Sequence, residues 1–441
     1  MDRQSGQNGE GGPVTVGVWD ERTTFRGWPA VRLCNGLVEA VIVPDIGGRV
    51  MAFNLGERAF LWVNPALEGK LFSAEENMGD GMLAAWKNYG GSKTWPAPQG
   101  WDTDEEWHGP PDPVLDTGRY NLEAVERSAG AVSARVTSPD DPRTGVRITR
   151  QLTIRPGSAR ALLRLEMENV SPIPRRWSLW DVVQLDATRR TEAGETYNDQ
   201  AWVYIPANPQ SAFPNGYRVM FGAQENPEWR RLGELVAAQY SYQVGKIGVD
   251  SRAGWVAFAD QADGYVFCQR FSVFPDEVYP DGGATVECWT TGLGVSVSGL
   301  DYARDPLYHV EAEVLGPLRL MQPGERQAFE IEWCAARCPG PVVAVGEAGC
   351  CHQRLRVQTG PGGLRLTGVY GVFEPGTARL VWRGGQEMIL AEETIASVSP
   401  LEALRLDALC RSPEGWQSVE LVIVNTAGVP VGALDRADRN D

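Results

Sequence analysis

The chain has 441 residues, of which 43% are hydrophobic and 22% charged, and its formal net charge is −16. This length favours two domains, and the acidic balance argues against nucleic acid or an anionic membrane as a partner. The 50 glycines and 30 prolines interrupt the chain too often for long helices, so we expect strands and turns to dominate.

The start of the chain, MDRQSGQNGEGGP, is polar and rich in glycine, and we expect residues 1–13 to form a flexible N-terminus. It lacks the apolar stretch of a signal peptide, and no apolar run in the chain is long enough to span a membrane. The eight cysteines have no regular spacing and only three histidines are present, so the sequence predicts no metal site and no cofactor. These features favour a reduced, cytoplasmic setting.

Residues 14–65 alternate between apolar and polar positions and predict consecutive strands separated by tight turns. Arg49 follows a glycine pair and is expected to share one strand face with Met51 and Phe53. An arginine at such a position is either a surface charge or a donor directed into a cleft.

Residues 71–120 do not alternate and are predicted to form one long loop, which is uncommon unless the loop is functional. This segment is rich in tryptophan and also carries Lys93. Aromatic rings with a few directional polar groups suit a flat polar ligand such as a sugar, so we expect Lys93 and Trp95 to contact a ligand. The alternative is an ordered cover with a small apolar core of its own.

Strands resume from residue 121 onwards. The exception is Pro227–Gln239, where a proline at the start and apolar residues at intervals of three to four predict a helix. Further strands then follow, with Lys246 on one of them and a turn containing Asp281 that leads to Glu287.

The segment Tyr308–Arg337 alternates like two strands joined by proline-glycine turns. Glu311 and Glu313 are two residues apart and therefore point to one face of the first strand. Two adjacent carboxylates repel each other unless solvent, a cation or a proton lies between them. The sequence leaves open whether this face is simply solvated or handles protons.

The composition changes after Trp333 to small residues, proline and glycine, as expected at a domain boundary. We expect a first domain over residues 14–340 and a small β-sandwich over residues 345–435, built from short alternating segments.

Several motifs together resemble the galactose mutarotase-like superfamily, which includes the aldose 1-epimerases. NGLVEAVIVPDIGGRVMAF is similar to the opening strands of these proteins, and VEAEVLGPLRLMQPGE is similar to their closing strands. NYGGSKTWPAPQ, KIGVD and YPDGGATVECWT resemble an uncharacterised bacterial branch, a domain of unknown function. The resemblance covers roughly Val31 to Arg337. It implies an all-β fold, an antiparallel β-supersandwich with a saccharide cleft on one face, followed here by the small C-terminal β-sandwich.

The resemblance also implies roles for individual residues. Glu311 falls where the superfamily has its catalytic base, and Glu313 shares its face one alternation later. Trp180 takes the place of the superfamily's catalytic histidine, so Asp181, Lys246 or His108 would have to act as the acid. The remaining positions implied to bind substrate are Arg49, Lys93, Trp95, Trp180, Gln184, Lys246, Asp281 and Glu287.

Three interpretations remain open. The first is a carbohydrate-active enzyme that acts on a sugar or sugar acid, either as an epimerase or as a lyase or hydrolase. The second is a saccharide-binding protein without catalysis, and the third is a structural β-protein with an interaction module. The first two predict a saccharide ligand, and none predicts nucleic acid or membrane as a partner. The sequence does not indicate an oligomeric state.

Overall fold

The computed structural model describes residues 18–295 and 300–439. The predicted all-β class is confirmed, because the described residues contain one α-helix, α1 (Ala74–Met78), and three short 3-10 turns, Pro65–Leu67, Leu83–Ala85 and Gly385–Glu387. Within them no helix is long and apolar enough to cross a membrane. The predicted flexible N-terminus, residues 1–13, lies outside the described residues.

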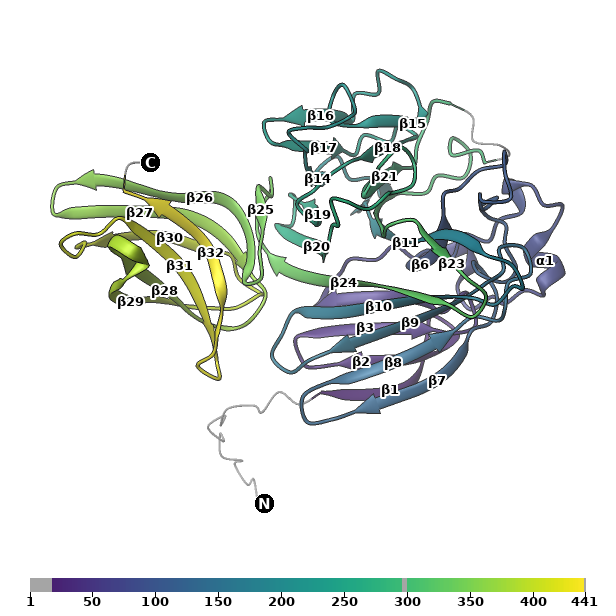
Figure 1. Ribbon diagram of the computed structural model, residues 1–441, viewed down its shortest axis with the longest axis horizontal. Helices are drawn as coiled ribbons and strands as arrows, with labels where there is room; N and C mark the ends of the chain where they lie inside the picture. Colours follow the sequence, from purple (N-terminus) through teal and green to yellow (C-terminus); the bar gives the residue numbers. More distant parts are fainter. Residues whose placement is uncertain (1–17, 296–299, 440–441) are drawn as a thin grey trace, which may run out of the picture.

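Two large antiparallel sheets form the first part of the molecule (Figure 1). The first has the order β1 (Trp19–Phe25), β2 (Trp28–Cys34), β3 (Val38–Val43), β4 (Arg49–Leu55), β6 (Ser92–Ala97), β11 (Arg175–Asp186), β22 (His309–Leu315), β21 (Val286–Thr290), β18 (Gly245–Val249) and β15 (Arg218–Gly222), with β5 (Arg58–Ala59) beside β4 and β23 (Arg319–Met321) beside β11. The second has the order β16 (Trp229–Leu232), β17 (Leu235–Gln239), β14 (Ala201–Pro206), β19 (Trp255–Asp260), β20 (Tyr265–Phe271), β24 (Arg326–Arg337), β10 (Arg160–Asn169), β9 (Val146–Ile154), β8 (Val132–Thr137) and β7 (Asn121–Arg127). A small hairpin, β12 (Thr188–Thr191) and β13 (Gly194–Tyr197), extends from β11.

The two large sheets pack face to face around one apolar core. Phe53 of the first sheet meets Phe267 and Trp333 of the second in edge-to-face contacts with ring centroids 5.8 and 5.6 Å apart. Each such ring buries a large apolar area, on the order of 150–250 Å². The inward-facing residues of both sheets therefore hold the sheets together. The opposite face of the first sheet takes no part in this contact between the sheets.

The C-terminal part is a separate pair of four-stranded sheets (Figure 1). One contains β25 (Ala344–Val345), β26 (Gly349–Gly360), β27 (Gly363–Val372) and β30 (Leu404–Cys410), and the other contains β29 (Ile389–Val398), β28 (Gly376–Arg383), β31 (Ser418–Asn425) and β32 (Pro430–Asp438). These sheets enclose their own core, yet Cys350 and Phe373 also pack into a buried cluster with Cys268 and Cys338 at the junction with the second large sheet. It stays a prediction that the chain divides into two domains between residues 340 and 345.

The predicted helix over Pro227–Gln239 is wrong. This segment forms the hairpin β16–β17, in which Leu232 pairs with Leu235. Gly233 has a φ of +60°, and glycine at the first position of a two-residue loop is typical of hairpin turns. Pairing with β14 overrides the apolar spacing that favoured a helix.

The predicted long loop over residues 71–120 contains a strand, β6, that lies inside the first sheet. The segment is predicted as a loop because it does not alternate, and it also contains Pro96, which cannot donate to a ladder. However, β6 pairs with β4 only through Ser92 and Val50, whereas its pairing with β11 is continuous. On the side of β4, Pro96 therefore faces no paired residue to which its backbone would have to donate a hydrogen bond.

The expected alternation of Arg49, Met51 and Phe53 on one face is also wrong. The register between β3 and β4 shifts so that Val41 pairs with Ala52 and Ile42 with Val50. Met51 is the extra residue of a β-bulge, and a bulge turns the side chains that precede it relative to those that follow. Phe53 consequently packs between the large sheets, and Met51 packs in a different cluster.

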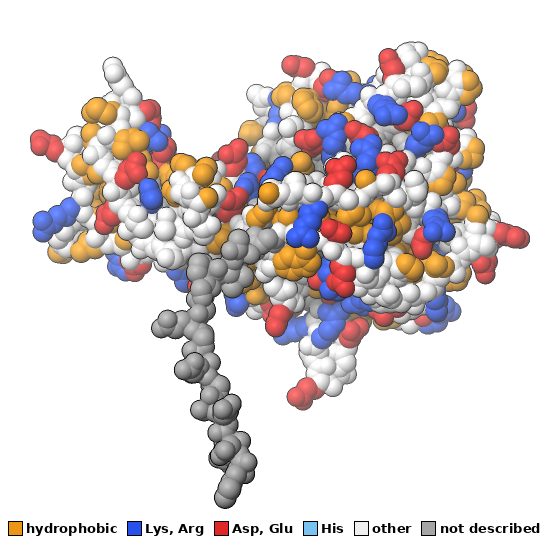
Figure 2. Space-filling view, turned by 90° about the horizontal axis from the view of Figure 1, so that it is seen from below, with side chains coloured by type: hydrophobic (Ala, Val, Ile, Leu, Met, Phe, Trp, Pro, Cys, Tyr) orange, Lys and Arg blue, Asp and Glu red, His pale blue; other side chains and the backbone are white. Residues whose placement is uncertain are grey.

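The outer surface carries charges of both signs. Figure 2 shows Lys and Arg side chains interspersed with Asp and Glu on the face seen from below. Arg135 of β8, for example, lies 2.8 Å from Glu123 and 2.9 Å from Glu166. Such exposed pairs each contribute about 0–1 kcal/mol, so they keep the surface hydrated and do not decide the fold.

Candidate functional site

Five neighbouring strands of the first sheet carry polar and aromatic side chains on one face. Alternate residues of a strand point to the same side, and here this applies to Lys93 and Trp95 of β6, Trp180 and Gln184 of β11, His309, Glu311 and Glu313 of β22, Glu287 and Trp289 of β21, and Lys246 of β18. A pocket of about 320 Å³ lies against this face, lined by Trp95, Trp180, Lys246, Asp281, Glu287, Trp289, Tyr302, His309 and Glu311 together with several apolar residues.

Glu311 is held by two donors in this pocket. The ammonium of Lys93 lies 3.1 Å from its Oε1, and the amide of Gln184 donates to the same oxygen at 2.7 Å. Burial alone would raise the pKa of Glu311, but the charge of Lys93 outweighs it, so the pKa lies below its ordinary value. Within the described residues Oε2 accepts no hydrogen bond, and the side chain keeps 11% of its surface exposed. Glu311 is therefore an ionised carboxylate with one oxygen available to a ligand.

His309 is a pocket residue that sequence reasoning missed. It stacks on Trp62 with ring centroids 4.4 Å apart, and its Nε2 lies 3.1 Å from the amide nitrogen of Gln184. Burial lowers the pKa of His309 to about 3, so the ring is neutral and its Nε2 accepts the hydrogen bond. The available signal was its position two residues before Glu311, on the same strand face.

Lys246 lies between two further glutamates. Its ammonium is 2.6 Å from Oε2 of Glu287, 3.1 Å from Oε2 of Glu313 and 4.2 Å from the ring centroid of Trp180. The indole of Trp180 also donates to Oε2 of Glu313 at 2.9 Å. Burial by itself would lower the pKa of Lys246, but the two carboxylates raise it above its ordinary value, so Lys246 stays a cation.

The carboxyl groups around Lys246 hold their protons more tightly than free carboxyls do. Burial, reinforced by the charges of Asp281 and Glu313, raises the pKa of Glu287 well above its ordinary value. Burial also raises the pKa of Glu313 and of Asp281. One face of the pocket thus contains carboxyl groups whose pKa values are shifted in opposite directions, downwards for Glu311 and upwards for Glu287, Glu313 and Asp281. Such a difference is typical of acid and base partners.

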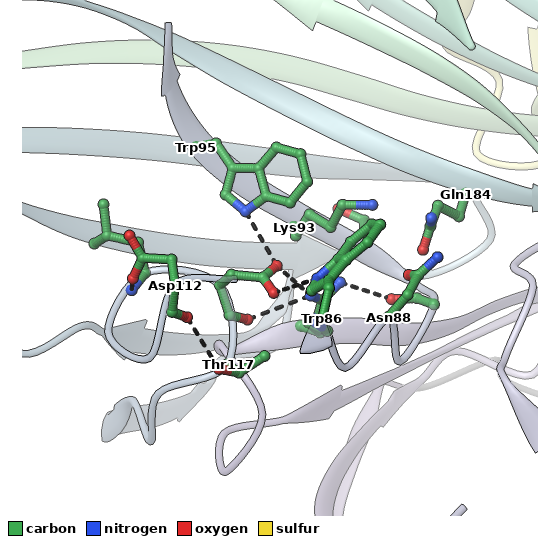
Figure 3. Close-up of polar contacts among 12 residues, drawn as sticks. Trp86, Asn88, Lys93, Trp95, Asp112, Thr117 and Gln184 are labelled. Atoms are coloured by element: carbon green, nitrogen blue, oxygen red, sulfur yellow. Dashed lines mark hydrogen bonds and ion pairs between the residues drawn. The ribbon is translucent and has the colours of Figure 1, made fainter. Parts of the chain in front are cut away.

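The tryptophans are fixed from behind by Asp116, which sequence reasoning also missed. The carboxylate of Asp116 accepts from the indole of Trp86 at 2.7 Å and from that of Trp95 at 3.2 Å. The ammonium of Lys93 lies 4.8 Å from the ring centroid of Trp95 and 5.6 Å from that of Trp86. Figure 3 shows the side chains of Lys93, Trp86 and Trp95 close together. Full enclosure lowers the pKa of Lys93. The aromatic wall of the pocket is therefore held in a fixed orientation.

Arg49 is not a pocket residue, in contrast to its predicted role. Its side chain is fully buried, forms an ion pair with Asp116 and donates to the carbonyl of Gly90 at 3.0 Å. Arg49 thus supports the tryptophan wall and cannot reach a ligand directly.

Asp181 is also outside the pocket, because it points to the other side of β11. It lies 3.4 Å from Arg150 of the second sheet and accepts from Thr94 at 3.1 Å. Burial raises the pKa of Asp181 to about 6, but this group lies between the sheets. His108 is likewise no candidate for the acid, since it is exposed and stacks on Trp101. The expected roles of Asp181 and His108 as acids therefore have no geometric basis.

The other predicted site residues come together. Trp95, Trp180, Lys246, Asp281, Glu287 and Glu311 line the pocket, and Lys93, Gln184 and Glu313 contact them directly. Their individual roles stay predictions.

The family comparison matches residues 29–335 with the family described as Domain of unknown function (DUF4380), which is well over half of the chain. The chain belongs to this family. The match runs from β2 into β24, so it covers the two large sheets except β1. It includes every residue of the pocket and leaves out the C-terminal sandwich.

Solved structures similar to this DUF4380 chain include two from the mutarotase group. A galactose mutarotase-like protein from Clostridium acetobutylicum is 10% identical with a TM-score of 0.45, and the match covers 73% of this chain and 99% of that one. The galactose mutarotase related enzyme from Lactobacillus acidophilus is 9% identical with a TM-score of 0.41, covering 71% and 100%. A TPR-domain containing protein from Parabacteroides distasonis is 12% identical with a TM-score of 0.44, covering 72% of this chain but only 49% of that one.

Over residues 18–295 and 300–439, no group of three or more His, Cys, Asp and Glu side chains is arranged to hold a metal ion. The pocket carboxylates are instead bound by Lys93 and Lys246.

Proposed function

We propose that this protein binds a saccharide in the pocket on the first sheet and transfers protons on it, with Glu311 as the general base. The observation that carries the proposal is Oε2 of Glu311, an ionised carboxylate oxygen at the pocket with no partner among the described residues. A general base must lie within hydrogen-bonding reach of the proton it removes, and Oε2 meets that condition for a ligand hydroxyl.

The aromatic walls support a sugar as the ligand. Trp95, Trp180 and Trp289 line the pocket together with Tyr302, and such rings pack against the apolar face of a sugar while charged groups bind its hydroxyls. The volume of about 320 Å³ lies at the lower end of the range for ligand pockets, roughly 300–1,000 Å³. This size favours a monosaccharide or one terminal residue of a longer chain.

The charge of the pocket favours a neutral sugar over a sugar acid. Three acidic side chains line it, Asp281, Glu287 and Glu311, whereas Lys246 is the single cation among the described lining residues, since His309 is neutral. Lys246 is already bound by Glu287 and Glu313, so a carboxylate or phosphate on the ligand would find no free cation there. Anion binding would then cost desolvation without compensation.

The simplest reaction for such a site is the interconversion of sugar anomers, which needs one base and one acid. Whether the protein catalyses epimerisation, lyase cleavage or hydrolysis depends on the identity of the ligand. Glu311→Gln keeps the size of the side chain and its contact with Lys93 but cannot accept a proton at neutral pH.

The test combines binding and turnover. A panel of neutral aldoses is titrated against tryptophan fluorescence, and anomer exchange or product formation is followed by NMR. In Glu311→Gln we expect turnover to fall about 10²–10⁴-fold while binding changes little. Glu313→Gln is the matched comparison on the same strand face and is expected to have a milder effect on turnover. Equal turnover in Glu311→Gln and the unaltered protein would remove Glu311 from the mechanism.

A binding protein without catalysis is the second candidate, and one observation favours it. Lys93 lowers the pKa of Glu311, and a carboxylate with a low pKa is a weak base. Saccharide binding without any exchange or product across the panel would support this alternative.

A further inference from the structure

The group around Lys246 contains more carboxyl groups than cations. Glu287 and Glu313 both contact its ammonium, and Asp281 lies beside Glu287 in the turn that precedes β21. One ammonium neutralises one carboxylate, and Glu287 and Glu313 are direct cross-strand partners. Like charges in such a position disfavour double ionisation, so one of the two glutamates carries a proton.

The hydrogen bonds show which glutamate it is. Oε2 of Glu313 receives two donors, the ammonium of Lys246 at 3.1 Å and the indole of Trp180 at 2.9 Å. Both donors stabilise the ionised form of Glu313. Within the described part of the chain, the ammonium of Lys246 is the one donor that Glu287 receives, and Glu287 also lies within hydrogen-bonding reach of the carboxyl of Asp281. Glu313 is therefore the ionised member of the pair.

Among the described residues, none donates a hydrogen bond to the second oxygen of Glu287. Oε1 of Glu287 is buried without a donor, the carboxyl of Asp281 lies within hydrogen-bonding reach of Glu287, and the Glu287 side chain lines the pocket. A carboxylate oxygen in that position would be an unpaired buried charge, which is costly, whereas a protonated oxygen is neutral and can donate to a ligand.

We propose that Glu287 is the general acid of this site, the partner of the base Glu311, and that it delivers the proton on Oε1 to an oxygen of the bound sugar. This inference rests on the proposed function. Glu311 pairs with Trp289, two residues from Glu287 on β21, so the two glutamates are diagonal neighbours, about 7–8 Å apart and somewhat closer at their Cβ atoms. Both carboxyl groups can therefore reach the same small ligand.

The proton transfers balance for anomer interconversion. Glu311 takes the proton of the anomeric hydroxyl, the electrons of that O–H bond form the C1 carbonyl, and the bond from C1 to the ring oxygen breaks. Glu287 gives its proton to the ring oxygen, which becomes a hydroxyl. After rotation of the aldehyde, the ring oxygen attacks the other face, Glu287 regains its proton and Glu311 returns the proton to the anomeric oxygen.

The first test measures the proton directly and needs no substrate. The protein is labelled with ¹³C at the glutamate side-chain carboxyl, and the carboxyl signals are followed by NMR through a pH titration. Burial also raises the pKa of Glu228 to about 7, so the Glu228 signal is first assigned with Glu228→Gln. Apart from that signal, we expect one glutamate signal that stays protonated at neutral pH, that is lost in Glu287→Gln, and that persists in Glu311→Gln.

A second variant makes this test specific. In Glu313→Gln the ammonium of Lys246 serves Glu287 alone, so the Glu287 signal should titrate at a lower pH than in the unaltered protein. A signal other than that of Glu228 that survives in Glu287→Gln would assign the proton elsewhere. The absence of any glutamate other than Glu228 protonated at neutral pH in the unaltered protein would overturn the proposal even if Glu287→Gln failed to fold.

The second test measures turnover. Glu287→Gln should lower the rate of anomer exchange about 10²–10⁴-fold with saccharide-induced fluorescence retained, and it should remove the loss of activity at high pH. Unchanged activity, or an unchanged loss at high pH, would refute Glu287 as the acid. If no saccharide binds the unaltered protein, the proposed function fails, whereas the carboxyl titration still reports the protonation of Glu287.

Discussion

Lys93→Met is the most informative single change for the electrostatics of the pocket. Methionine has a similar length to lysine but no charge, so the change removes the partner of Glu311 and leaves the packing against Trp86 and Trp95 largely intact. In the native protein the Lys93 side chain is fully buried and that of Glu311 is 11% exposed. Removing one member of a buried pair leaves the other charge uncompensated, at a cost of about 3–5 kcal/mol. We expect the lower end, because Glu311 keeps its bond to Gln184 and some contact with solvent.

The loss of stability should depend on pH. In the native protein the folded pKa of Glu311 is lowered, so its contribution to stability is present above the unfolded pKa and is lost as the pH falls through the folded pKa. In Lys93→Met, burial is no longer opposed by a near cation, and the folded pKa rises above the unfolded one. In the variant, the contribution of Glu311 to stability is then fully present at low pH and is lost as the pH rises through the folded pKa of Glu311. The difference between the two proteins should therefore be larger at about pH 8 than at about pH 5.

Urea denaturation followed by tryptophan fluorescence at both pH values measures this difference. The double variant Lys93→Met/Glu311→Gln should recover part of the loss, since no unpaired charge remains, with a coupling energy of about 0.5–3 kcal/mol. Arg365→Met is the matched control, because Arg365 and Asp407 lie 2.7 Å apart but are 58% and 59% exposed, and solvent screens an exposed pair so that its loss changes stability little. Equal losses at both pH values, or no recovery in the double variant, would refute the reasoning.

Two further changes probe the support of the tryptophan wall, both measured by urea denaturation. Asp116→Asn should destabilise the protein by about 3–5 kcal/mol because it leaves the buried Arg49 without its counter-charge, and a loss under about 0.5 kcal/mol would contradict this. Gly47→Ala should cost more than Gly264→Ala. Both glycines have a positive φ, +80° and +71°, which costs alanine about 1–2 kcal/mol, but only at Gly47 would a Cβ atom lie 2.0 Å from the carbonyl oxygen of Asp116, whereas Gly264 has open space. Equal losses in the two alanine variants would show that the backbone there yields easily.

Some of the site could be derived from sequence because strands have a period of two. Glu311 and Glu313 share a face in the structure as that period requires, and His309 follows from the same rule although it was not singled out. The motifs around Lys93, Lys246 and Glu287 were recognised by resemblance, and the structure brings them to one pocket. The period does not determine which residues of other strands contact each side chain.

The sequence by itself determined the all-β class and, on a regular strand such as β22, which residues face one way, because these depend on local alternation, glycine and proline. Only the tertiary structure decided that Lys93 neutralises Glu311 across 218 positions of the chain, that a bulge at Met51 places Arg49 behind the pocket, and that Asp181 points between the sheets. A strand pattern specifies two faces, whereas the packing of one sheet against another decides which face becomes the core and which becomes the site.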